Sequence, residues 1–122
     1  MRKAPVALIA FAAALATAGS AVAAAPMTNN VAKFSVANGS LRYGQKSVTT
    51  KPGLTEIVFT NNSTAPHNVS LEHNGEFEFG STLTIRKGVI TAFLTLAKGT
   101  YHVYSSVGTD EDKGMAATLI VK

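Results

Sequence analysis

Few side chains in this sequence have the types and spacing that catalysis or metal binding requires. The three histidines, at positions 67, 73 and 102, do not form the His-Glu-x-x-His pattern with which zinc peptidases hold their metal. No serine is flanked by the glycines of a nucleophile elbow. Glu76 and Glu78 share one face of a strand, but on a polar hairpin such a carboxylate pair is a solvated face rather than an acid–base pair. We therefore predict that the protein is not an enzyme.

One combination of segments does indicate a site. The first segment, residues 61–69, reads Asn-Asn-Ser-Thr-Ala-Pro-His-Asn-Val, and the second, residues 98–105, reads Lys-Gly-Thr-Tyr-His-Val-Tyr-Ser. Gly114 and Met115 follow in the next loop. This order of motifs, over roughly residues 46–122, resembles the plastocyanin–azurin family of small blue-copper proteins, the cupredoxins.

The resemblance implies a position for each copper ligand. Family members place a copper-binding His in the Pro-His-Asn-Val segment, a Cys at the end of the Gly-Thr-Tyr segment, and a His and a Met in the loop that follows. His67 and Met115 match the first and last of these ligands. Ser105 stands at the position of the Cys, and Asp110 stands at the position of the second His. The loop 105–115 has the length found in many bacterial members, with Gly-Thr in place of their Pro-Gly pair.

These two substitutions change the metal chemistry that the resemblance implies. A blue-copper centre binds copper through two His and one Cys in a trigonal arrangement, with a weak axial Met. The chain has no cysteine at all, and the Ser105 hydroxyl stays protonated at neutral pH and is a weak ligand. Asp110 offers a hard oxygen, which suits Cu(II) and does not favour Cu(I). Copper is therefore a possible cofactor by family resemblance, and the missing Cys disfavours electron transfer.

Two functions remain open from the sequence. One is a cupredoxin-like module with an incomplete copper site, which binds a partner or has a structural role and needs no metal. The other is a protein that binds copper weakly, without a blue colour, through His67, Asp110 and Met115. In the first case His67 is a buried histidine that belongs to the fold, and Met115 packs in the core.

The elements that must position these residues are strands. Apolar and polar residues alternate along most of the chain after residue 30, which is typical of half-buried strands, and turn pairs such as Asn38-Gly39 and Asn74-Gly75 separate them. We predict an all-β, cupredoxin-like antiparallel Greek-key sandwich of seven to nine strands. The expected strands are 33–36, 40–43, 46–50, 55–61, 67–73, 82–85, 89–96, 100–105 and 117–122.

The same alternation predicts which side chains form the core. On the strand 100–105, Val103 shares a face with Tyr101 and Ser105, while His102 and Tyr104 point the other way. The other expected core residues are Ile57, Phe59, Val69, Leu71, Leu119 and Val121.

The first 24 residues have the pattern of a secretory signal. Arg2 and Lys3 precede an apolar run, residues 4–18, and small residues at 20–24 supply a cleavage site. We therefore predict a signal peptide over residues 1–24 and one cupredoxin-like domain over residues 25–122. The apolar run is short for a membrane span, so we expect no span after cleavage and a secreted or periplasmic protein.

The charge of the expected mature chain excludes one class of partner. Removing Arg2 and Lys3 leaves nine basic residues against seven acidic ones, which is a net charge of +2 rather than the +4 of the whole chain. The basic residues are spread singly and never cluster, so a nucleic-acid partner is not indicated. The sequence leaves open a protein or small-molecule partner outside the cytoplasm.

Overall fold

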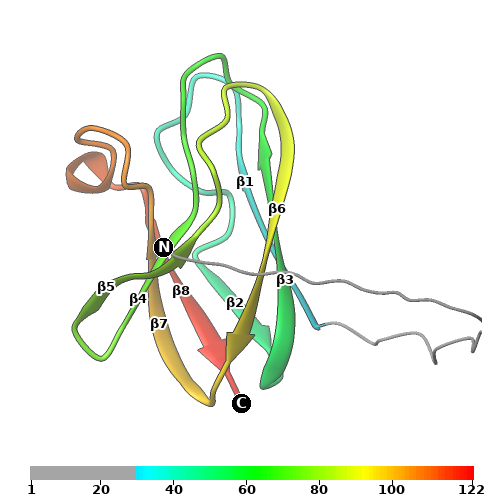
Figure 1. Ribbon diagram of the computed structural model, residues 1–122. Helices are drawn as coiled ribbons and strands as arrows, with labels where there is room; N and C mark the ends of the chain where they lie inside the picture. The colour runs from blue at the N-terminus through cyan, green and yellow to red at the C-terminus, as the bar shows by residue number, and fades with distance from the viewer. Residues whose placement is uncertain (1–29) are drawn as a thin grey trace, which may run out of the picture.

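The computed structural model describes residues 30–122, apart from the side chains of residues 76–78. The predicted signal peptide and its boundary with the domain lie outside the described residues. The described chain forms eight strands and one short 3₁₀ helix, η1 (Figure 1). They are β1 (Asn30–Val36), β2 (Ser47–Thr50), β3 (Gly53–Asn61), β4 (Ser70–His73), β5 (Glu76–Ser81), β6 (Gly88–Leu96), β7 (Gly99–Tyr104), η1 (Glu111–Lys113) and β8 (Ala116–Val121).

The strands form two sheets that pack face to face (Figure 1). One sheet has the order β1-β3-β6 and the other has the order β2-β8-β7-β4-β5. The predicted all-β sandwich and its strand number are thus confirmed. The pairs β1–β3 and β2–β8 run parallel, so both sheets are mixed. The alternation of apolar and polar residues is the same for parallel and antiparallel strands, so the sequence could not predict the parallel pairs.

Three elements differ from the strands that the sequence predicts. Residues 40–43 and 82–85 form no strand, and only the isolated bridges Val36–Tyr43 and His67–Ile85 remain there. At the first of them the Ser40 hydroxyl accepts a hydrogen bond from the backbone of Arg42, which makes the segment a turn. Conversely, β5 pairs with β4 where the sequence indicated only a polar hairpin.

The core lies between the sheets and contains the predicted residues. All of those named from the alternation are buried, together with the rings of Phe34 and Tyr43, which meet edge to face. Tyr101, Val103 and Ser105 point inward on the β7 side, as expected, and His102 is exposed. Tyr104 is also buried, although it lies on the outward face, where its ring stacks on that of His102. In residues 30–122 no helix has the length and apolar character that crossing a membrane requires.

Candidate functional site

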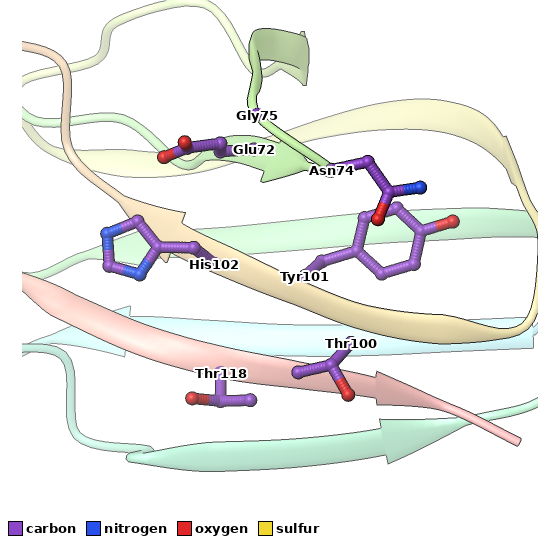
Figure 2. Close-up of a pocket in the computed structure, with 7 residues that line it drawn as sticks. All are labelled: Glu72, Asn74, Gly75, Thr100, Tyr101, His102 and Thr118. Atoms are coloured by element: carbon purple, nitrogen blue, oxygen red, sulfur yellow. The ribbon is translucent and has the colours of Figure 1, made fainter.

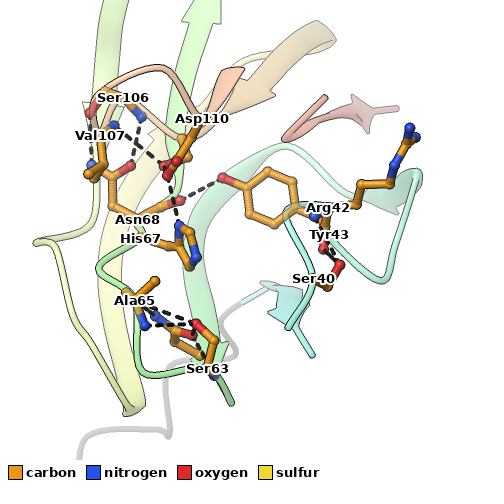
Figure 3. A network of polar contacts seen from close by, with 12 residues as sticks. Ser40, Arg42, Tyr43, Ser63, Ala65, His67, Asn68, Ser106, Val107 and Asp110 are labelled. Atoms are coloured by element: carbon orange, nitrogen blue, oxygen red, sulfur yellow. Dashed lines mark hydrogen bonds and ion pairs between the residues drawn. The ribbon is translucent and has the colours of Figure 1, made fainter. Parts of the chain in front are cut away.

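One carboxylate oxygen joins the residues that the sequence singled out. Asp110 Oδ2 lies 2.7 Å from His67 Nδ1 and 2.8 Å from the Ser105 hydroxyl oxygen, which donates to it. Figure 3 shows the Asp110 side chain directed at the His67 ring. An ionised carboxylate can only accept hydrogen bonds, so the His67 Nδ1–H donates to it. We call these three residues the Asp110 centre.

The loops of one end of the sandwich position the Asp110 centre. His67 lies between β3 and β4, and its backbone exchanges two hydrogen bonds with that of Ile85, at 3.1 and 3.0 Å. Ser105 directly follows β7, and its N–H donates to the carbonyl of Met115. Asp110 begins the turn that leads into η1, and its carbonyl accepts from the N–H of Met115 at 3.1 Å. Met115 therefore lies at the same end of the domain as His67, and its side chain is fully buried in the core.

His67 is enclosed almost completely. Its side chain is 2% exposed, and its second ring nitrogen, Nε2, is buried and has no hydrogen-bond partner among the described residues. A hollow of about 240 Å³ lies beside the ring and is lined by the turns at 38–41 and 63–65. The imidazole is therefore held by Asp110 through Nδ1, while its other ring nitrogen makes no hydrogen bond within the described chain.

Residues next to the centre support it, and the sequence did not single them out. Asn68 and Ser106 exchange two hydrogen bonds, each of 2.9 Å, which tie the loop after β7 to the segment that carries His67. The buried Tyr43 hydroxyl donates to the carbonyl of Asn68 (Figure 3). The only sequence signal for these contacts was the position of Asn68, directly after the histidine in the Pro-His-Asn-Val motif.

Burial raises the pKa of the Tyr43 hydroxyl far above its ordinary value of 10.0, and the negative charges of Asp110 and Glu111 add to this. The unfolded chain loses this proton near pH 10, whereas the folded chain keeps it. Tyr43 thus favours folding at lower pH, and we expect stability to fall by about 1.4 kcal/mol per pH unit above pH ~10 on its account. Urea unfolding of the protein and of Tyr43→Phe at rising pH measures this. Equal slopes for the two proteins would contradict the prediction.

Asn61 holds the turn that precedes His67. The side chain is fully buried, and its amide nitrogen donates to the carbonyls of Ala65 and Ile85, both at 2.8 Å. Its amide oxygen accepts from the N–H and the hydroxyl of Ser63, at 2.9 and 2.7 Å. Because Ile85 also pairs with His67, Asn61 joins the two segments that fix the histidine.

Asn61→Ala is expected to lower the free energy of unfolding by about 2–4 kcal/mol, because it removes four hydrogen bonds and leaves buried groups without partners. Asn62→Ala is the matched control, since Asn62 is the next residue and its side chain is exposed. We expect the control to change stability by less than about 0.5 kcal/mol. Urea unfolding of both variants decides, and similar losses for the two would show that the Asn61 network does not carry this stability.

A second and larger hollow lies away from this centre, on the outer face of β4, β7 and β8. It has a volume of about 430 Å³ and includes Glu72, Thr100, His102 and Thr118 in its lining (Figure 2). His102 Nε2 lies 2.8 Å from Glu111, but both side chains are more than 40% exposed, which makes the pair weak.

The fold is that of the cupredoxins. The solved structures that share it include the dithionite-reduced auracyanin of Roseiflexus castenholzii, with a TM-score of 0.69 and 19% identity over 75% of this chain and 96% of that one. Plastocyanin from Dryopteris crassirhizoma follows with a TM-score of 0.60 and 23% identity, over 75% of this chain and all of that one. A purple cupredoxin from Nitrosopumilus maritimus has a TM-score of 0.59 and 19% identity, over 75% and 99% of the two chains. No protein-family model and no curated protein matches the chain.

The residues present do not fit the copper that this fold implies. The described chain contains no cysteine and no group of three or more His, Cys, Asp or Glu residues that could hold a metal ion. His67 Nδ1 and the Ser105 hydroxyl both face Asp110 Oδ2, so a carboxylate oxygen stands between the groups at two of the ligand positions. The chain thus lacks the thiolate and the second histidine of a blue-copper site. In their place, Asp110 accepts hydrogen bonds from His67 and Ser105.

Proposed function

We propose that this chain is an exported cupredoxin-fold protein that acts as a binding or structural module and not as an electron carrier or an enzyme. The observation that carries the proposal is the contact of Asp110 Oδ2 with both His67 Nδ1 and the Ser105 hydroxyl. Hydrogen bonds within the protein thereby satisfy groups that would otherwise face a metal. Export rests on the signal pattern of residues 1–24, and the mass of the exported protein tests it.

Thermal unfolding with added metal tests the metal-independent role. A ligand that binds only the folded state raises the unfolding temperature, by an amount that grows with the logarithm of its free concentration relative to its dissociation constant. We expect equimolar Cu(II) or Zn(II) to leave the unfolding midpoint of the protein unchanged and to give no intense visible colour, because no thiolate is present. A clear rise with Cu(II), retained after removal of excess metal, would contradict a metal-independent role.

A weak, non-blue copper site is the second candidate. Its support is that two groups able to bind Cu(II) lie side by side, and Cu(II) would have to displace the hydrogen bond between them. His67 Nδ1 and Asp110 Oδ2 lie 2.7 Å apart, and imidazole and carboxylate are both ligands for Cu(II). Met115, the third ligand of this hypothesis, lies in the adjoining segment. In this case Cu(II) would raise the unfolding midpoint of the protein. His67→Ala would abolish the rise and Asp110→Ala would reduce it, each variant being compared with its own metal-free form.

A further inference from the structure

Strand β6 leaves one long edge of the smaller sheet without a partner. It pairs with β3 over nine residues without a break in register, and β3 is its sole neighbour in the sheets of the described chain. Its outward-facing side chains are Val89, Thr91, Phe93 and Thr95. Val89 is 60% exposed and Phe93 is 54% exposed, so two large apolar side chains alternate with threonines on this strand, opposite Thr60 and Glu56 of β3.

The β6 edge lacks the features that normally keep edge strands apart. Natural edges carry charged residues, prolines or bulges, or are very short. From Gly88 to Ala97 the chain has no charged residue and no proline. The other edges of the described sheets are protected: β1 carries Lys33, β2 has four residues, and β5 carries two glutamates and meets an irregular register on β4.

We propose that β6 pairs in the antiparallel direction with β6 of a second copy of this chain. Between Val89 and Phe93 the outward side chains of β6 read apolar-Thr-apolar in both directions, so this segment is complementary to itself, and Thr95 continues the outward face beyond it. Pairing centred on Thr91 places Thr91 opposite Thr91 of the second copy, and Val89 opposite Phe93. Pairs of threonines, and of an aromatic with a β-branched residue, are favourable across strands.

This pairing gives a closed assembly. A two-fold axis at Thr91 uses both β6 edges and joins the two smaller sheets into one, in which β6 is no longer an edge. A different protein would need a strand that matches this apolar order, whereas a second copy provides it by symmetry. The dimer does not involve the Asp110 centre, so it is independent of the metal question.

Sedimentation over a range of concentrations tests the dimer with charge-paired variants. Thr91 is exposed, so substitution there leaves the fold intact. We expect wild type to be a dimer. Thr91→Lys or Thr91→Glu, each placing like charges opposite one another, should raise the dissociation constant at least about tenfold. An equimolar mixture of the two variants should form a mixed dimer, because opposite charges then meet at the axis.

Val31→Lys is the matched control, because Val31 lies on β1 at the other edge of the same sheet and is 42% exposed. We expect this variant to remain a dimer. A wild type that stays monomeric at every concentration would overturn the proposal. So would a Thr91 pair that does not recombine, a control that dissociates as readily as Thr91→Lys, or growth into larger polymers.

Discussion

Asp110→Ala is expected to lower the free energy of unfolding by about 2–4 kcal/mol, because it leaves two buried hydrogen-bonding groups without an acceptor. These groups are the Nδ1–H of His67 and the hydroxyl of Ser105, both on residues that are 1% exposed. Urea unfolding at neutral pH measures the loss. If Asp110 acts through this centre, Asp110→Ala should cost less in a Ser105→Ala background, where one of the two groups is already absent.

Asp112→Ala is the control for this prediction. Asp112 lies two residues further along the same loop, in η1, and its side chain is exposed. It carries the same charge, so a general effect of loop charge would appear in both variants. We expect the control to change stability by less than about 0.5 kcal/mol. Equal losses for Asp110→Ala and Asp112→Ala would show that the contacts of Asp110 with His67 and Ser105 have no special weight.

The second large effect is expected from restoring the two missing ligands. Ser105→Cys combined with Asp110→His should bind Cu(II) and give an intense visible absorption, because a thiolate then reaches the metal beside two imidazoles and Met115. The geometry favours this outcome, since the side chain at 110 already lies within hydrogen-bond distance of both Ser105 and His67. Copper bound to the folded double variant should also raise its unfolding midpoint, measured against the metal-free double variant, which has lost the hydrogen bonds of Asp110.

The single variants separate the contributions to this effect. Asp110→His alone has no thiolate and should stay without intense colour, whereas Ser105→Cys alone keeps Asp110 in the centre. Absorption spectra and metal analysis after dialysis measure both properties. A double variant that is folded, colourless and free of copper would show that the loop 105–115 does not present its side chains as a copper site requires. The likeness to copper proteins would then concern the fold alone.

Much of the fold and of the candidate site follows from local pattern. Period-two alternation identified the buried faces of β3, β7 and β8, because a strand of a sandwich has one face in the core. The order of the two motifs placed His67, Ser105 and Asp110 in one region, and the structure brings their side chains into contact. The sequence also indicated that the Ser and Asp substitutions remove a blue-copper ligand set.

The remaining features depend on contacts between segments that are distant in the sequence. Tyr43 meets the carbonyl of Asn68 across 25 residues, and no local pattern marks that pair. Asn61 reads as a turn residue, yet its four hydrogen bonds depend on where the segment at Ile85 returns. The alignment of motifs placed Asp110 at a ligand position. It could not show that Asp110 accepts hydrogen bonds there, because this depends on the directions of the side chains.

The proton on His67 tests the central claim most directly. Nitrogen-15 NMR of the histidine rings, recorded with and without one equivalent of Zn(II) or Cu(I), reports whether Nδ1 carries a proton or binds a metal. Because His67 Nδ1 lies 2.7 Å from Asp110 Oδ2 and the side chain is 2% exposed, we expect a hydrogen-bonded, slowly exchanging proton on Nδ1 that added metal does not change. Loss of the Nδ1 proton signal on addition of one equivalent of metal would contradict the account.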